Sequence, residues 1–207
     1  MQAKLQRRQT LSDARRALVL DAARAVFPEA GIEGASIREI ARRAGYTPGA
    51  IYSYFESKEA IYAALLDESL LRLRTAVGEA EAFAERPALT LASKARAWFG
   101  FYAAHPRELD LGFYLVHGMR PRGLTSELDH ALNDRLKEAL DPCEEALRAM
   151  GLDAAEALRE NTALFAHGVG LLLMRHTGRI RMFGQSADAL FEAYIGQLVA
   201  RVRPAVA

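Results

Sequence analysis

Apolar residues recur at every third or fourth position through most of the chain, which is the spacing of one buried face of an α-helix. No segment shows the sustained apolar–polar alternation of a half-buried strand, and β-branched residues are sparse beside Ala, Leu, Arg and Glu. Capping residues, glycines and prolines divide this pattern, and Pro142 is expected to kink one of the helices. The sequence predicts an all-α protein whose nine helices lie at about residues 12–31, 36–45, 48–55, 57–85, 88–104, 107–117, 128–150, 153–176 and 186–203.

The first three predicted helices have the arrangement of a helix-turn-helix. Ser36 and Glu39 are expected to form a capping box at the start of the second helix, and Gly45 ends that helix in a tight turn. Thr47 can cap the third helix, and Pro48 suits its first position. A helix that enters the major groove must be short and firmly packed on its partner. The residues expected on its exposed face are Thr47, Pro48, Gly49, Ala50, Tyr52, Ser53 and Tyr54.

A helical hairpin without function, whose tyrosines are half-buried core residues, fits the same composition. The order of the residues favours the helix-turn-helix. Over about residues 14–66 the sequence closely resembles the DNA-binding head of tetracycline-repressor-type (TetR/AcrR) regulators. The resemblance depends on Val19-x-x-Ala22-Ala23-x-x-x-Phe27-x-x-x-Gly31, Ser36-Ile37-x-x-Ile40-Ala41-x-x-Ala44-Gly45 and Thr47-Pro48-Gly49-Ala50-Ile51-Tyr52-Ser53-Tyr54-Phe55-x-Ser57-Lys58-Glu59.

The resemblance implies a DNA-binding head at residues 1–56 and a six-helix ligand-binding and dimerisation domain at residues 57–207. It implies a homodimeric repressor that binds a palindromic operator in double-stranded DNA and responds to a small-molecule effector. Thr47 to Ala50 match the base-facing start of the recognition helix, and Arg38 matches a contact to a base edge or a phosphate. The positions that match phosphate contacts are Ser36, Tyr52, Tyr54 and Lys58.

The C-terminal part offers two sets of candidate effector contacts. Aromatic and histidine residues on the predicted fifth and sixth helices could line an apolar cavity for an apolar or aromatic ligand, or could be packed core. These residues are Trp98, Phe101, Tyr102, His105, Phe113, Tyr114 and His117. Phe165 and His167 lie in a segment that loosely resembles one subgroup of these regulators, although a histidine such as His167 is more often a core or interface residue than a ligand contact.

The last two predicted helices are the candidate dimer element. Gly168 and Gly170 permit a close helix approach beside the apolar run 171–174, and the ninth helix is apolar along one face. Two such helices from each protomer would form a four-helix bundle, as the resemblance implies. The alternative to a ligand-responsive repressor is a ligand-independent DNA-binding protein whose C-terminal domain only dimerises.

Charge and composition narrow the function classes. Residues 1–58 carry ten Lys and Arg against six Asp and Glu, a net charge of +4, whereas the rest of the chain carries −3. A basic head on an acidic body suits a polyanionic partner. The longest stretch without a charged residue, 161–174, is shorter than the about 20 residues that span a bilayer.

Chemistry-bearing motifs are few. Cys143 is the single cysteine, no H-E-x-x-H or Gly-rich phosphate loop occurs, and no secretory signal opens the chain. We therefore expect a cytoplasmic protein that is not an enzyme and has no metal, no cofactor and no membrane partner.

Overall fold

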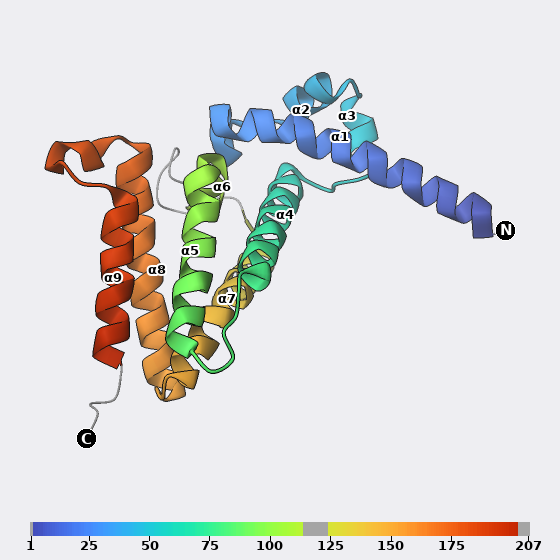
Figure 1. Cartoon of the computed structure of the whole chain (residues 1–207). Helices are drawn as coiled ribbons and strands as arrows, with labels where there is room; N and C mark the ends of the chain where they lie inside the picture. Colours follow the sequence, from blue (N-terminus) through green and yellow to red (C-terminus); the bar gives the residue numbers. More distant parts are fainter. Residues whose placement is uncertain (1, 114–123, 203–207) are drawn as a thin grey trace. The chain divides into compact units, whose positions relative to one another are not determined.

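The computed structural model describes residues 2–113 and 124–202, and in these ranges the chain is helical and contains no strand (Figure 1). The all-α prediction is confirmed. The elements are α1 (Gln2–Gly34), α2 (Ile37–Ala44), α3 (Pro48–Ile51), α4 (Lys58–Glu79), α5 (Pro87–Ala104), α6 (Pro106–Phe113), α7 (Ser126–Ala149), α8 (Ala154–His176), a 3-10 helix η1 (Arg179–Phe183) and α9 (Ala187–Val202). In the described part of the chain, no helix has both the length and the apolar character needed to cross a membrane.

The chain packs as two compact units. The first comprises Met1–Ser69 with Arg107–Asn133, and the second comprises Leu70–Pro106 with Asp134–Ala207. The first unit therefore extends beyond the head predicted at residues 1–56. Contacts from α4 and α6 explain the extension, because the Tyr62 ring meets the edge of Phe27 at 5.1 Å and the Tyr62 hydroxyl donates to the Leu111 carbonyl.

Helix α1 begins ten residues earlier than predicted, at Gln2 rather than near Ser12. Strong helix formers occupy the first residues, and no Gly or Pro precedes Pro28, so nothing in the chain stops the helix from extending. Gly31, where the first helix was predicted to end, interrupts it with a non-helical backbone, φ 67° and ψ 179°. Leu18 is 51% exposed, and the packed face begins at Val19.

Helix α4 ends at Glu79, six residues before the predicted end, and a buried lysine explains why. Lys94 of α5 is only 6% exposed, and its ammonium donates to the carbonyls of Val77, Gly78 and Ala80 at 2.9, 2.9 and 2.7 Å. The last carbonyls of a helix have no hydrogen-bond donors within the helix, and here the buried ammonium of Lys94 provides those donors. All three N–H bonds of the ammonium are used, so the charge is satisfied in the interior.

Three later elements agree with or refine the predicted boundaries. The backbone of α7 stays helical through Pro142. Helix α8 opens with a full capping box. The Asp153 carboxylate accepts from the Glu156 amide at 2.8 Å, and the Glu156 carboxylate accepts from the Asp153 amide at 3.2 Å. The predicted linker after α8 contains η1, which is bounded by left-handed Gly178 and Gly184.

Candidate nucleic-acid interface and effector site

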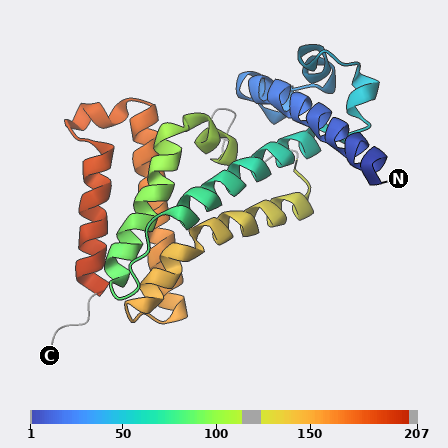
Figure 2. The same cartoon turned by 45° about the vertical axis from the view of Figure 1, so that its right-hand side comes forward.

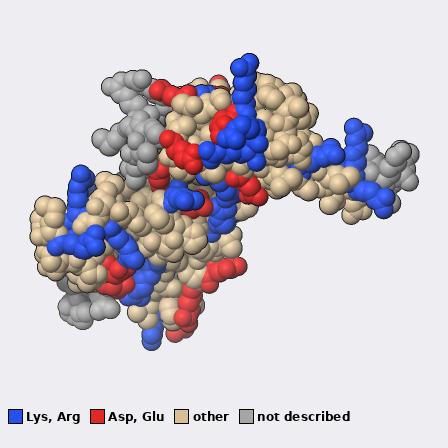
Figure 3. Space-filling view, turned by 90° about the horizontal axis from the view of Figure 1, so that it is seen from above, with Lys and Arg blue, Asp and Glu red and all other residues tan. Residues whose placement is uncertain are grey.

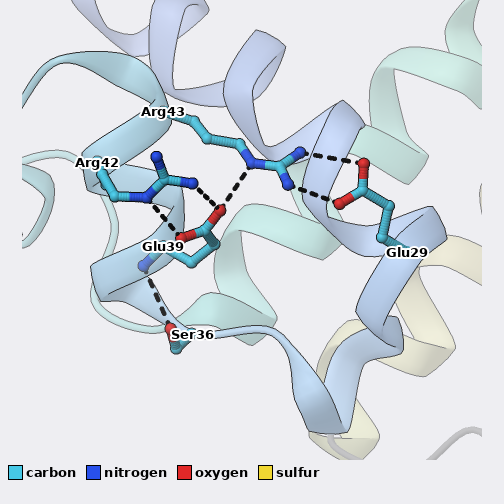
Figure 4. Close-up of polar contacts among 5 residues, drawn as sticks. All are labelled: Glu29, Ser36, Glu39, Arg42 and Arg43. Carbon is cyan, nitrogen blue, oxygen red and sulfur yellow. Dashed lines mark hydrogen bonds and ion pairs between the residues drawn. The ribbon is translucent and has the colours of Figure 1, made fainter.

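The start of α2 is capped by Ser36 alone. Its hydroxyl accepts a hydrogen bond from the Glu39 amide at 3.2 Å. The prediction of a full capping box is wrong, because the Glu39 carboxylate does not accept from the Ser36 amide. The Glu39 carboxylate turns instead to two arginines of its own helix. Arg42 donates to it at 2.8 and 2.6 Å, and Arg43 donates at 2.8 Å (Figure 4). Two charged donors attract a carboxylate more strongly than one backbone amide, so the reciprocal cap is lost.

Arg43 also joins α2 to α1. Its other two nitrogens donate to Glu29 at 2.6 and 3.3 Å, so one guanidinium bridges a carboxylate on each helix (Figure 4). The arginine hydrogen bonds hold the pKa of the Glu39 carboxyl at about 2, and Arg43 also lowers the pKa of Glu29. The network links α2, the helix that precedes the recognition helix, to α1.

A three-residue turn, 45–47, connects α2 to α3. Gly45 has φ 72° and ψ 28°, and the Tyr46 amide donates back to the Ala41 carbonyl at 2.9 Å. No heavy atom lies within 4 Å of a Cβ built on Gly45, so its left-handed backbone, rather than a lack of space, requires glycine there. Thr47 caps α3 by accepting from the Ala50 amide at 3.3 Å.

The predicted recognition face is presented to solvent. Thr47, Pro48, Gly49 and Ser53 are exposed, Tyr52 is 58% exposed, and Ala50 and Tyr54 are half-buried. The core side of the helix is anchored by fully buried Ile51. Exposed small residues at the start of a capped helix leave room for close approach to another molecule.

Two further predicted DNA contacts lie on α2 or at its cap. Ser36 is exposed at the N-cap, and Arg38 is exposed on the first turn. Within the described residues Arg38 makes no ion pair, in contrast to Arg42 and Arg43 on the same helix. Its guanidinium is therefore available to contact DNA.

Lys58 makes different contacts from those predicted. Its ammonium donates to the carbonyls of Glu33 and Ala35 at 2.9 and 3.1 Å, so two of its three N–H bonds hold the segment after Gly31 against the start of α4. The carbonyls that end α1 lack helical partners, which explains why a cation is drawn to them. In the free protein this side chain is a junction between helices.

The basic N-terminal part of α1 contributes to the predicted positive charge of the head, but none of its residues was among the predicted DNA contacts. Figure 3 shows Lys and Arg side chains along the projecting end of this helix, and Arg7 and Arg8 are exposed there. Nearer the core, Arg16 lies 4.8 Å over the Phe55 ring, and a hydrogen bond to Tyr54 raises the pKa of Arg15. The signal was present, since four arginines, at 7, 8, 15 and 16, precede the packed face without a helix breaker.

The aromatic residues expected to line an effector cavity pack on one another instead. Trp98 and Tyr102 are 0% and 1% exposed, and the Trp98 ring meets Phe165 and Phe191 at 5.1 and 5.2 Å. A Cβ added to Gly168 would lie 2.2 Å from the Trp98 ring. The glycine thus serves ring packing within one protomer. Of the two alternatives for these aromatic residues, the packing around Trp98 supports packed core.

The remaining candidates do not gather around Trp98. His105 is exposed and stacks on Phe101 at 5.1 Å, while Phe113 belongs to the other compact unit. Tyr114 and His117 lie outside the described residues.

His167 contacts α9 rather than the tryptophan. Its ring stacks on Tyr194 at 4.1 Å, and burial lowers the pKa of the imidazole. Its Nε2 and the Trp98 Nε1 are buried atoms with no hydrogen-bond partner among the described residues. The aromatic core thus contains two buried nitrogen atoms whose hydrogen bonds are not satisfied by the described residues.

Helices α8 and α9 lie side by side (Figure 2), and their outward faces are the candidate dimer surface. On α8, Leu158 and Leu173 are 54% and 38% exposed. On α9, Ile195 and Leu198 are 3% and 0% exposed, so the apolar stripe of α9 faces the core of its own protomer. The exposed face of α9 carries small or polar residues, namely Ala189, Ala193, Gly196, Gln197 and Ala200.

Residues 19–65 match the family model described as bacterial regulatory proteins, tetR family. The N-terminal domain therefore belongs to the tetR family. The A-factor receptor protein of Streptomyces griseus is 54% identical over 50 residues, which are 24% of this chain and 18% of that protein. The transcriptional repressor AcnR of Corynebacterium diphtheriae is 38% identical over 65 residues, 31% of this chain and 34% of the repressor.

The matched segments thus span only about a fifth to a third of these TetR-family relatives. The similarity of fold extends further. The crystal structure of the regulatory protein SCO4313 covers 93% of this chain and 98% of its own, with a TM-score of 0.75 at 18% identity. Every predicted DNA contact, from Ser36 to Lys58, lies inside the tetR-family match, and every predicted effector contact lies outside it.

Proposed function

We propose that this TetR-family chain is a DNA-binding transcriptional repressor that acts as a homodimer on a palindromic operator. The observation that carries the proposal is the exposed, capped start of α3 on a head whose helices are joined by Glu29, Arg43 and Glu39. A recognition helix must be held rigidly to select bases in the major groove. The tetR-family model matches residues 19–65, which include these helices.

Base and backbone contacts divide between the two helices of the motif. The exposed residues from Thr47 to Gly49 are small enough to bring the start of α3 against base edges. Tyr52 and Arg38 present a hydroxyl and an unpaired guanidinium for phosphates, which position the head. Because Lys58 is already engaged by two carbonyls, we assign it a positioning role.

The basic end of α1 adds charge to the same unit. Arg7 and Arg8 project from the first helix and are exposed, and no acidic residue precedes Asp13. Such residues increase affinity for any DNA sequence and make it more dependent on salt.

A homodimer is needed because two half-sites of a palindrome lie about 34–36 Å apart, one turn of the duplex. The outward faces of α8 and α9 are the surface that supports it. Exposed Leu158 and Leu173 supply apolar area, and the small residues of α9 permit close helix approach. We also propose that a small molecule releases the protein from DNA, because the chain is similar to a protein named as a receptor, the A-factor receptor protein.

The direct test is binding of the purified chain to the DNA upstream of its own gene, measured by fluorescence anisotropy against an unrelated fragment of equal length. Sequence-specific binding with a stoichiometry of two chains per site is expected. Arg38→Ala should weaken binding, whereas Lys137→Ala, an exposed cation of α7, serves as the matched control. Equal affinity for both fragments would contradict the proposal.

The alternative is a DNA-binding protein whose C-terminal part only dimerises. The filled aromatic core around Trp98 favours it over a ligand at that position. Operator affinity that no apolar compound changes would decide for this alternative.

A further inference from the structure

Helix α1 extends well beyond the packed part of the head (Figure 1). Among the described side chains Val19 is the first that is buried, and those from residue 6 to residue 18 are exposed except half-buried Ser12. We name residues 2–18 the α1 arm. An α-helix rises about 1.5 Å per residue, which makes the arm roughly 25 Å long. The arm lies outside the tetR-family match, which begins at residue 19.

The charges of the α1 arm suit a polyanionic partner. Its basic residues are Lys4, Arg7, Arg8, Arg15 and Arg16, and its single acidic residue is Asp13. The Asp13 carboxylate accepts from the Gln9 side chain at 2.9 Å. Within the described residues, neither Arg7 nor Arg8 makes an ion pair. Figure 3 shows basic side chains standing out from this end of the helix, so their charges are open to another molecule.

One face of the α1 arm is continuous with the end of the recognition motif. Arg8 and Arg15 are seven residues apart, two helical turns, so they lie on the same face about 10 Å apart. Arg15 is hydrogen-bonded to Tyr54, and Arg16 lies 4.8 Å over the Phe55 ring. Asp13 is two residues from Arg15 and therefore lies on the opposite face. The face that Arg8 shares thus leads directly to Tyr54, which matches a phosphate contact.

We propose that the α1 arm is a second DNA-binding element, a basic helix that contacts the phosphates next to those held by the recognition motif. Double-stranded DNA carries one negative charge per about 1.7 Å of its axis, so phosphates are available along the whole arm. Phosphate contacts carry no sequence information, and the arm therefore adds affinity and length to the contacted site without changing base preference. The proposal rests on the proposed function, because the recognition helix brings the arm beside the duplex.

An anionic membrane is the other polyanion that a basic helix can bind. Leu11 and Leu18 are 54% and 51% exposed and lie among the arginines, which a membrane-bound helix also requires. DNA is favoured because the hydrogen bond from Arg15 joins the arm to Tyr54, inside the tetR-family match.

The test measures binding of the full-length protein to the DNA upstream of its own gene and to an unrelated fragment of equal length, by fluorescence anisotropy over a range of salt concentrations. Replacing Arg7 and Arg8 together by Gln should weaken binding to both fragments by at least about tenfold. It should reduce the slope of log affinity against log salt by about 2 for each bound chain. The ratio of the two affinities should stay unchanged, because only phosphate contacts are lost.

A second variant separates a positioned helix from mere charge. Leu11→Pro keeps every charge but breaks the helix between Arg8 and Arg15, so it should weaken binding to both fragments by about threefold or more. Arg148→Gln removes an exposed arginine of α7 and is the matched control, which should bind both fragments as the unchanged chain does. Melting temperatures of the arm variants should equal that of the unchanged chain, because the replaced side chains are exposed.

The proposal is overturned if the Arg7 and Arg8 double variant binds DNA like Arg148→Gln, or if Leu11→Pro binds like the unchanged chain. It is also overturned if the double variant loses sedimentation with phosphatidylglycerol vesicles while its DNA binding stays unchanged, which would make the arm a membrane element. Equal affinity of the unchanged chain for the two fragments would contradict the proposed function alone, because the effect of the arm is measured on the unrelated fragment as well.

Discussion

The guanidinium of Arg43 bridges Glu29 on α1 and Glu39 on α2, with N–O distances of 2.6 and 2.8 Å. One side chain of α2 thereby connects the helix that precedes the recognition helix to α1. Because protonation removes the negative charge of either carboxylate and replaces an acceptor with an O–H donor, the bridge is sensitive to acid.

Acid should weaken the head through Glu39. Its pKa is about 2 in the folded protein, below the ordinary 4.5, so its ionised form stabilises the fold. That contribution is complete above about pH 4.5 and is lost as the pH falls towards 2. Urea unfolding between pH 7 and pH 3 should show stability that falls with pH, and Glu39→Gln should flatten the slope. The same slope in Glu39→Gln would show that other carboxylates cause it.

Substitutions of Lys58 and Arg38 should distinguish a residue that positions the helices from one that contacts a DNA phosphate. Lys58→Met leaves two carbonyls without their donor and should cost about 1–3 kcal/mol of stability. The salt dependence of DNA binding should be the same for Lys58→Met as for the unchanged protein. Arg38→Ala should leave stability unchanged and reduce the slope of log affinity against log salt by about 1. Chemical denaturation and salt titration of operator binding measure both effects, and a reduced salt slope in Lys58→Met would return Lys58 to the DNA contacts.

Substitutions on α8 and α9 should distinguish the dimer surface from the core. Leu173→Glu and Leu158→Glu place a charge on an exposed face and should yield folded monomers. Leu71→Glu, on a 58% exposed residue of α4, should remain dimeric. Leu198→Ala, at a fully buried position, should instead lose about 2–5 kcal/mol of stability. Sedimentation and thermal melting report these outcomes, and a dimeric Leu173→Glu would place the interface elsewhere.

Gly168→Ala should disturb the aromatic core. The added Cβ would lie 2.2 Å from Trp98 and 3.0 Å from Phe191, so the rings must shift at a cost of about 1–3 kcal/mol. Trp98 emission should shift with them. Gly100→Ala, on α5 with no heavy atom within 4 Å of the new Cβ, is the control and should be neutral or stabilising. Equal melting temperatures for the two variants would contradict close packing at Gly168.

The Cys143 thiol should be unreactive in the folded protein. Burial raises its pKa to about 12, so the reactive thiolate is scarce at neutral pH. A thiol reagent should modify it at the rate of unfolding, and denaturant should accelerate the reaction. Rapid labelling in native buffer would contradict its burial.

The local chemistry of the head could be predicted from the sequence because it depends on neighbours along the chain. Ser36, Gly45 and Thr47 each act within four residues of their own position, as caps or as a left-handed turn. Side chains whose partners are distant were harder to predict. Lys58 finds carbonyls 25 and 23 residues away, and Lys94 ends α4 from the next helix.

The sequence by itself determined the helical class, the helix-turn-helix and its family, because periodicity, capping and motif order are written along the chain. Only the tertiary structure decided which face of α9 is buried, that the Trp98 cluster is filled, and that a pocket lies between α1, α4 and α6. An apolar helix face looks alike in sequence whether it meets its own core, a second protomer or a ligand. Packing alone distinguishes them, because the space left between side chains depends on residues far apart in the chain.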